Sequence, residues 1–379
     1  MSVETLVRIA PGVRLRPPPN AWSNDRWHVV DLTSRREKLI SPAVAALLVT
    51  FFRPGPLAVR LAEMLRWWPQ SKPEQVAGAA SVLLDAGMLV PADDPDAVET
   101  AERHRRWHQR GWSAALDHHM TTYDYPYFDY AQVEAFDLDA SMMAGYARAR
   151  PDDDRYKSYP AADERIAGPA TSAALARLSC PVRTAWSNEP SRSVPTTAED
   201  VLTLLSAVFG QVRSRRPKGP NRVPLIRKTS PSGGARHPVE AYLFASAIDG
   251  LRPGVYHFAT RDNQLERIGD LVAPDELRRM MTGAHRYRSA EPAGYLVLTG
   301  VWSRNMYRYR EPRTYRTVFM DAGHVAATTE LVGRGLGLPV FWHHGIDDEA
   351  IHRAIGVPVN GLSEGVIFGA AIGITAAAS

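Results

Sequence analysis

The first ninety residues alternate short apolar runs with breaks at proline and glycine. Apolar residues at helical spacing, interrupted at Gly55-Pro56 and ended at Gly87, predict helices, and Ser41-Pro42 has the residue types that begin one. The predicted order is a strand, three helices and a closing strand, at residues 27–32, 42–52, 57–68, 72–86 and 88–90.

This order of elements predicts a winged-helix-like domain over residues 1–92. The third helix, KPEQVAGAASVLLDAG, has one lysine and two acidic residues, which argues against contacts with the phosphates of DNA. A small domain with an exposed strand can instead pair with an extended peptide. We therefore expect peptide recognition by this domain, and a purely structural role is the alternative that the sequence leaves open.

Residues 93–184 are expected to form a helical linker region. An acidic, proline-containing stretch at 93–100 precedes a predicted helix at 101–120, which carries His104 and His108 at i, i+4 spacing. No His-Glu-x-x-His sequence accompanies them, so a face of Trp and His side chains that packs on the main domain is predicted, and no metal site. Residues 150–170 are polar and rich in proline, and we expect a mobile loop there.

A second series of elements begins near residue 185 and continues to the C-terminus. Thr196, with Glu199 three residues later, predicts a capped helix that ends at Gly210. The apolar pattern then predicts the two strands of a hairpin, a buried strand, a long helix, a short strand, a last helix and a final strand, at residues 254–258, 265–268, 294–301, 318–337, 341–345, 347–355 and 365–374.

The most informative stretch is RKTSPSGGARHPVEAY, residues 227–242. Three hydroxyl side chains, two adjacent glycines and two basic side chains come just before an apolar run. Glycine lets backbone N–H groups approach an anionic or planar ligand, and hydroxyls and arginines complete such a cradle. A tight Pro-Ser-Gly-Gly turn would have the same composition, so the residues alone leave both interpretations open.

Composition narrows the class of protein. A chain of 379 residues with 45% hydrophobic and 23% charged residues is typical of a globular protein of two domains. The single cysteine, Cys180, excludes an internal disulfide and fits a reducing compartment, so we expect a cytoplasmic protein. No apolar run approaches the ~20 residues of a membrane span. A net charge of +4 is too small to predict binding to nucleic acid.

The phrase T-S-P-S-G-G-A-R-H-P followed by an apolar run resembles the flavin-binding segment of the nitroreductase superfamily. The resemblance is greatest to SagB-type dehydrogenases, which modify ribosomally synthesised peptides. It implies an α+β fold, a mixed sheet wrapped by helices, over residues 185–379. It also implies FMN as cofactor and a homodimer in which both subunits build each flavin site. By this resemblance, FMN would contact Arg227, Ser230, Pro231, Ser232, Gly233 and Gly234.

Two further motifs of that family are incomplete in this chain. An R-x-S-x-R motif that holds the flavin corresponds to residues 188–193, where Arg192 is present and the first arginine is absent. A Lys-Tyr pair implicated in catalysis corresponds to Arg308-Tyr309, with Met306-Tyr307 as a second register. Arg308 stays protonated at neutral pH and can stabilise an anion but not act as a base, whereas Tyr309 can relay a proton.

The long helix near the C-terminus contains Asp-Ala-Gly-His, which resembles the family's dimer-interface helix. His324 of this motif is expected to be a packing residue. The turn that ends the helix corresponds to a turn that lies against the flavin in the family, so the resemblance adds to the cofactor site Gly335, Leu336 and Gly337.

Three functions are compatible with these features. The first is an FMN-dependent dehydrogenase that modifies a ribosomally made peptide, with hydride passing to flavin N5 and the leader peptide bound to the N-terminal domain, beside co-acting modification enzymes. The second is an NAD(P)H-dependent flavin reductase of nitro compounds, quinones or dehydroamino acids. The third is a non-catalytic peptide-binding scaffold, which the missing motif residues suggest. The N-terminal domain favours the first, because a reductase of small molecules needs no such module.

Overall fold

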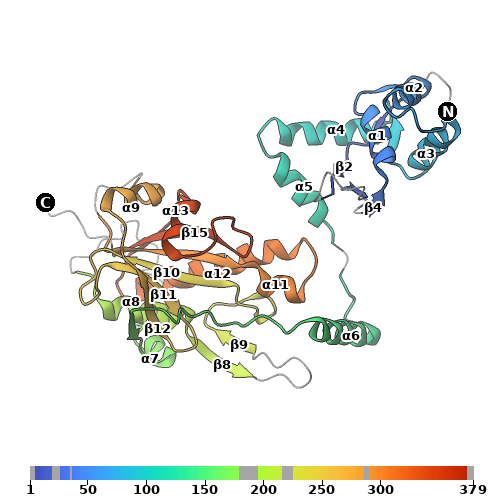
Figure 1. Cartoon of the computed structure of the whole chain (residues 1–379). Coiled ribbons are helices and arrows are strands. Elements are labelled where there is room, and N and C mark those ends of the chain that lie inside the picture. Colours follow the sequence, from blue (N-terminus) through green and yellow to red (C-terminus); the bar gives the residue numbers. More distant parts are fainter. Residues whose placement is uncertain are drawn as a thin grey trace. The chain divides into compact units, whose positions relative to one another are not determined.

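The computed structural model describes residues 5–18, 26–34, 36–125, 127–178, 195–215, 225–285 and 291–373. The chain divides into two compact units, Met1–Tyr127 and Phe128–Ser379 (Figure 1). Within the described part of the chain, every helix is too short or too polar to cross a membrane.

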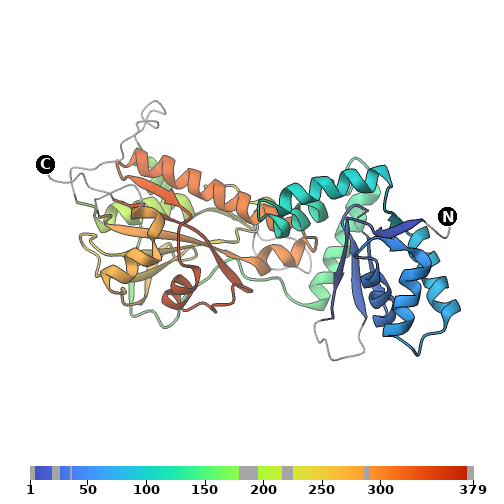
Figure 2. The ribbon, with the colours of Figure 1, turned by 90° about the horizontal axis from the view of Figure 1, so that it is seen from above.

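The described residues of the first unit form two small antiparallel sheets and a group of helices (Figure 2). One sheet has the order β5-β1-β6 and the other the order β2-β3-β4. The strands are β1 Leu6–Ile9, β2 Val13–Arg16, β3 Trp27–Asp31, β4 Arg36–Ile40, β5 Gly55–Pro56 and β6 Leu89–Pro91. The helices are α1 Pro42–Thr50, α2 Leu57–Trp67, α3 Pro73–Asp85, α4 Pro95–His108 and α5 Ser113–Thr122.

Local chemistry accounts for the first three helices, which lie where the apolar pattern predicts them. The Ser41 hydroxyl accepts a hydrogen bond from the Val44 amide at 3.3 Å, and Pro42 occupies the first helical position. Helices α1, α2 and α3 bury apolar side chains, Leu48 and Met64 among them, against strands β1 and β3 in one core. That shared core makes the unit compact.

Helix α4 corrects the expected linker at 93–100. The helix begins at Pro95, because the Asp94 carboxylate accepts a hydrogen bond from the Ala97 amide at 2.8 Å and proline is favoured in the first turn. The single helix expected at 101–120 is also interrupted, since Gly111 has a φ of +76° between α4 and α5.

The second unit is built on a seven-stranded sheet of order β14-β15-β13-β10-β11-β12-β7, whose described neighbours all pair antiparallel. Its strands are β7 Glu164–Ala167, β10 Val239–Ala245, β11 Gly254–Ala259, β12 Gln264–Gly269, β13 Gly294–Val301, β14 Val340–His343 and β15 Glu364–Ile372. A separate hairpin consists of β8 Gln211–Arg215 and β9 Leu225–Lys228.

Helices cover both faces of this sheet (Figure 1). The helices of the second unit are α6 Val133–Ala149, α7 Thr171–Ala176, α8 Ala198–Phe209, α9 Pro274–Met280, α10 Thr282–His285, α11 Trp302–Arg308, α12 Thr314–Gly335 and α13 Asp348–Ile355. Helices α8 and α12 share a core with one face, and α9 and α13 share a core with the other. Because side chains alternate along a strand, Leu243 of β10 enters the first core and Tyr242 the second.

The start of α8 differs by one residue from the prediction. Thr197, rather than Thr196, is the N-cap, and its hydroxyl accepts a hydrogen bond from the Asp200 amide at 3.2 Å. The Asp200 carboxylate accepts the Thr197 amide in return at 2.9 Å, which completes a capping box. The N-cap lies one residue later than predicted because Asp200, and not Glu199, is the acidic partner, and its short side chain still reaches the cap.

The expected mobile loop at 150–170 is wrong for two of its parts. Residues Glu164–Ala167 are the edge strand β7, which pairs with β12. Asp152 and Arg155 are buried, with 8% and 1% of their surface exposed. A polar side chain is expected to be exposed unless it finds a partner in the interior. Asp152 and Arg155 are buried because each has an oppositely charged partner.

Asp152 joins the coil after α6 to the glycine-containing loop that precedes β10. Its carboxylate accepts hydrogen bonds from Arg155 at 3.2 and 2.7 Å and from Arg236 at 2.9 and 2.7 Å. Arg236 also donates from Nε to the Arg304 carbonyl of α11. Three segments that are distant in the sequence are therefore tied at one buried carboxylate.

We predict that Asp152→Asn destabilises the protein by about 3 kcal/mol at neutral pH, because removing a charge leaves its buried arginine partners uncompensated. Burial raises the pKa of Asp152, but the Arg236 and Arg155 guanidinium groups outweigh it, and the net pKa lies well below the ordinary value. Because its pKa is lowered in the folded state, ionised Asp152 stabilises the protein fully at any pH above its unfolded-state pKa of about 3.9, and this contribution is lost as the pH falls toward the folded-state pKa. In urea unfolding, the difference in the free energy of unfolding between the wild type and Asp152→Asn should therefore shrink by roughly 1 kcal/mol per pH unit below about pH 4.

The matched control is Asp154→Asn, two residues away on the exposed side. Asp154 pairs with Arg261 at 2.9 Å, and both side chains are more than half exposed. Its replacement should change the free energy of unfolding by less than about 1 kcal/mol. Equal effects of the two substitutions, or a difference that does not depend on pH, would contradict the role given to Asp152.

Candidate functional site

The loop between β9 and β10 has an unusual backbone. Gly234, Ala235 and His237 have φ values of +58°, +52° and +46°, in the left-handed region that residues with a Cβ rarely adopt. Gly233–Ala235 form one short 3-10 turn. Non-glycine residues in this region are found where surrounding contacts hold them, and often at functional sites.

Asp321 of α12 supplies the contacts that hold this loop. Its carboxylate accepts a hydrogen bond from the Ser232 hydroxyl at 2.6 Å and another from the Gly233 amide at 3.0 Å. The Ser232 oxygen in turn accepts the His237 amide at 2.8 Å. Burial raises the pKa of Asp321, and the two hydrogen bonds oppose that rise. The loop therefore depends on a carboxylate from a helix almost ninety residues later.

Two hydroxyl groups of the loop lack a hydrogen-bonding partner among the described residues. They are Thr229 Oγ1 and Ser230 Oγ, and Ser230 is only 3% exposed. Buried polar atoms in proteins nearly always have a partner. Paired glycines, positive φ angles and two unpartnered hydroxyls are the features expected of a loop that lies against a polar ligand, so these residues fit a flavin.

Tyr309 lies directly against the loop. A Cβ placed on Gly234 would be 2.1 Å from the Tyr309 hydroxyl, so only glycine allows this approach. Tyr309 also lines an open pocket of about 850 Å³, together with Trp302 and Met306 of α11. In the alternative register, Tyr307 is fully buried. The geometry thus places Tyr309, not Tyr307, between the loop and a pocket.

Arg308 is held by an acidic partner from α6. Its Nη2 donates to both oxygens of Asp139 at 2.7 and 2.8 Å, and its guanidinium lies 5.0 Å from the centre of the Tyr309 ring. A paired guanidinium is neutralised in part, so Arg308 cannot present the full positive charge that an unpaired side chain would. Asp139 was not identified as a site residue from the sequence.

Lys228 is another residue that sequence reasoning missed. It precedes the loop on β9, and its amine donates to the Thr260 hydroxyl at 3.1 Å. Desolvation lowers the pKa of Lys228 to about 8, which is close enough to neutral for the amine to exchange protons. Burial also lowers the pKa of His237 to about 3, so that ring is neutral. An isolated lysine in a basic run gives no sequence signal for this shift.

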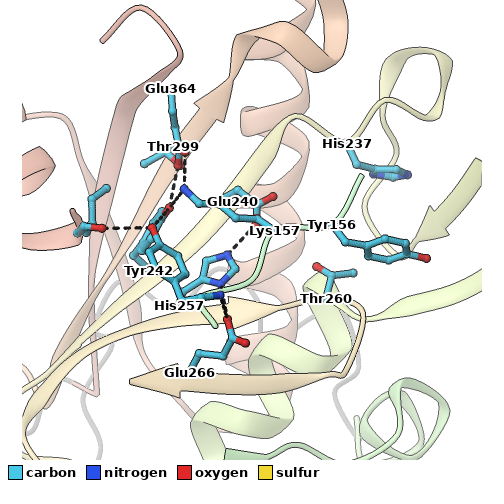
Figure 3. A network of polar contacts seen from close by, with 12 residues as sticks. Tyr156, Lys157, His237, Glu240, Tyr242, His257, Thr260, Glu266, Thr299 and Glu364 are labelled. Carbon is cyan, nitrogen blue, oxygen red and sulfur yellow. Dashed lines mark hydrogen bonds and ion pairs between the residues drawn. The ribbon is translucent and has the colours of Figure 1, made fainter. Parts of the chain in front are cut away.

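A second group of polar side chains lies on the face of the sheet that α9 and α13 cover (Figure 3). The Lys157 amine donates to the Tyr242 hydroxyl and to Glu364, both at 2.5 Å. Thr299 donates to the same carboxylate at 2.6 Å. Nearby, the His257 ring bridges two carboxylates, at 3.0 Å to Glu240 and 3.3 Å to Glu266.

This second group is a structural clamp. Burial lowers the pKa of Lys157, but Glu364 and other neighbours outweigh it and leave the pKa raised. Burial raises the pKa of Tyr242 well above its usual value. Lys157 is therefore charged and Tyr242 neutral near pH 7, and neither acts as a base. What the pair does is fix the coil after α6 against the sheet, next to Asp152.

The remaining predicted site residues do not all lie together. Arg192 lies outside the described residues. Arg227 is exposed on β9, and Pro231 lies beside Ser230 and Ser232 in a small pocket. Residues Gly335, Leu336 and Gly337 end α12, fourteen residues beyond Asp321 and so about 21 Å along the helix axis. Within one chain, these two parts of the predicted site are apart.

Known proteins match the part of the chain that carries this loop. Residues 192–374 match the model of the Nitroreductase family. Trifolitoxin-processing protein TfxB of Rhizobium leguminosarum bv. trifolii is 27% identical over 282 residues, 70% of this chain and 71% of TfxB. Microcin B17-processing protein McbC of Escherichia coli is 28% identical over 117 residues, 30% of this chain and 42% of McbC.

A solved structure of the E. coli microcin synthetase McbBCD complex with truncated pro-MccB17 bound is also similar. It aligns with a TM-score of 0.41 and 20% identity over 52% of this chain and 74% of that one. The family match covers the loop, Tyr309 and α12 together. Residues 192–374 therefore form a Nitroreductase family domain, and members of this family are typically flavin-dependent oxidoreductases.

Proposed function

We propose that this protein is an FMN-dependent dehydrogenase that modifies a ribosomally synthesised peptide. The observation that carries the proposal is the contact between the left-handed Gly234 and the hydroxyl of Tyr309, which joins a flavin-type loop to a proton-carrying side chain. The relatives TfxB and McbC, both named as processing proteins of peptide products, support a peptide as substrate.

The chain offers a chemically suitable set of groups for FMN. The hydroxyls of Thr229 and Ser230 would hydrogen-bond the cofactor, and the Gly233-Gly234 turn, which has no side chains, would allow it to lie close. Arg227, exposed on the adjoining strand, and Arg192 would supply positive charge for the phosphate. When bound, FMN supplies the acceptor for hydride at N5, and the protein supplies position and electrostatics.

Tyr309 and Arg308 would handle the proton and the charge. We assign Tyr309 to proton transfer, because its hydroxyl faces the loop and its ring lines the pocket. Arg308 would hold that ring by a cation–π contact, and Asp139 would hold Arg308. This arrangement assigns to Arg308 a positioning role where the family's lysine is absent.

A homodimer would complete the cofactor site. Helix α12 exposes Tyr315, Phe319, Met320 and Leu331, large apolar side chains that a second copy of the chain would cover. Such pairing would bring the Gly335–Gly337 turn of one subunit to the loop of the other. The 21 Å along α12 between Asp321 and Gly335 makes this contribution in trans the natural arrangement.

The N-terminal unit would recognise the leader segment of the peptide. Its strand β4 is at the edge of the sheet β2-β3-β4, and its residues Arg36 to Leu39 are exposed. An edge strand offers unpaired backbone groups to which an extended peptide can add. The winged-helix-like assignment and a cytoplasmic location belong to this proposal, as does cooperation with other modification enzymes.

Replacing Gly234 tests the cofactor site. Gly234→Ala should lower FMN binding at least about tenfold, because the added methyl group meets the Tyr309 hydroxyl at 2.1 Å and an L-residue is strained at a φ of +58°. The measurement is the flavin absorbance per chain after FMN titration and gel filtration. The control is Gly78→Ala in α3, where a Cβ meets nothing within 4 Å, and its FMN content should equal that of the wild type.

A chain that binds no FMN in its wild-type form would contradict the dehydrogenase and favour a peptide-binding scaffold. Equal FMN content in Gly234→Ala and wild type would remove the loop from the cofactor site.

Replacing Tyr309 tests the chemistry. Tyr309→Phe should keep its FMN and its reduction by dithionite, but should slow flavin bleaching by the peptide substrate by roughly 10²–10⁴-fold under anaerobic conditions, since a proton carrier is lost. Tyr307→Phe is the matched control, because Tyr307 is fully buried. A larger effect at Tyr307 would select the other register. Bleaching by NADPH alone, with oxidation of NADPH by nitro compounds, would instead show a small-molecule reductase.

A further inference from the structure

A surface groove in the N-terminal unit has no role in the flavin chemistry. It lies between the end of α1 and helix α2 and has a volume of about 860 Å³, which includes space open to solvent. We call it the α1–α2 groove and define it by the side chains that the argument uses, which are Phe52, Arg53, Arg60, Glu63, Arg66 and Trp67.

The floor of the groove is a fixed ion pair. Arg60 Nη1 donates to Glu63 at 2.6 Å, and Nη2 donates to the Pro54 carbonyl at 3.0 Å. A Cβ on Gly55 would be 2.4 Å from Arg60 Nε, so glycine at that position lets the guanidinium lie flat on the backbone. Only 16% of the Arg60 side chain is exposed, and its Nε has no partner among the described residues. The floor is therefore ordered before any ligand arrives.

The rim consists of two exposed aromatic rings and two exposed arginines. Phe52 and Trp67 keep 57% and 59% of their surface accessible. Arg53 and Arg66 are also exposed, and no ion pair to either is found in the described part of the chain. Large apolar rings that remain in contact with water are typical of binding surfaces when they are grouped.

The combination of residue types indicates what the groove would bind. Tryptophan and arginine are the residues most often responsible for the affinity of protein interfaces, and aromatic rings dominate the apolar contact. Three arginines against one glutamate give the groove a surplus of two positive charges. A ligand that carries both carboxylates and bulky apolar groups satisfies both kinds of side chain at once.

We propose that the α1–α2 groove binds a segment of the substrate peptide in which acidic side chains flank a bulky apolar side chain. The apolar side chain would lie between Phe52 and Trp67, and the carboxylates would pair with Arg53 and Arg66. This assignment rests on the proposed function, because it gives the peptide-modifying enzyme a recognition site on helices, separate from the strand β4. Glu63 neutralises Arg60 on the floor, so only the two rim arginines face a ligand, which suits a peptide with a few carboxylates better than a phosphate-rich polymer.

The test is fluorescence anisotropy of the full-length protein at physiological ionic strength, with a short fluorescein-labelled peptide. The probe has a Glu-Phe-Glu-Leu core between serine-rich flanks. Arg66→Glu and Trp67→Ala should each weaken binding at least about tenfold. Trp67→Phe should stay within about threefold of the wild type, because an aromatic ring remains. A probe with glutamine in place of glutamate should bind at least about tenfold more weakly, since the charge is lost.

The matched control is Arg103→Glu in α4, an exposed arginine outside the groove whose side chain is 62% accessible. It should bind the probe within about twofold of the wild type. Both groove variants replace exposed residues, so thermal unfolding should coincide with that of the wild type and exclude misfolding as a cause.

Three outcomes would overturn the assignment. They are unchanged binding by Arg66→Glu and Trp67→Ala, equal binding of the glutamine probe, and tighter binding of single-stranded DNA or of phosphatidylserine vesicles than of the peptide. FMN content of the same preparations is measured in parallel. Normal FMN content without peptide binding would reject the groove and leave the dehydrogenase standing, whereas loss of FMN in the wild type would reject the dehydrogenase itself.

Discussion

The buried carboxylate of Asp152 is the interaction on which the site most depends. It ties Arg155, in the coil after α6, to Arg236, in the loop before β10, and Arg236 continues the connection to α11. A charge in the interior is stable only when its partners are fixed, so the carboxylate imposes order on all three segments. Arg236 of the loop and the Arg304 turn of α11 are therefore positioned by this ion-pair cluster, and not by the loop's own sequence.

Helix α12 supplies the second constraint. Asp321 fixes the loop by accepting the Ser232 hydroxyl and the Gly233 amide, and it stands on a helix that is packed against the main sheet. The same helix exposes apolar side chains that a second chain would cover. Dimerisation and loop geometry would thus be coupled through one element. Because a helix transmits small shifts along its axis as a rigid body, a change at the exposed face would be felt at the loop.

Several local elements follow directly from neighbouring residues. The start of α1 at Ser41-Pro42 and the long β13 are predictable, since capping chemistry and apolar runs act over a few positions. The predicted cap lies one residue before the observed Thr197–Asp200 box, because either threonine can cap a helix and only the backbone conformation distinguishes them. The composition of residues 93–100 does not distinguish a linker from the start of α4, because acidic residues are common both in linkers and in the first turn of a helix.

By itself, the sequence determined the segment 229–237 as a candidate cradle, Arg308-Tyr309 as one of two registers for a catalytic pair, and a resemblance to a family over the C-terminal half, because such motifs are local. Tertiary structure alone decided that Asp321, Asp139 and Asp152 hold that segment and that pair. Their partners lie between 84 and 169 residues away. A carboxylate carries no mark of a distant partner, so a polar coil at 150–155 looked like an exposed loop. Burial and charge pairing emerge only once the chain has folded.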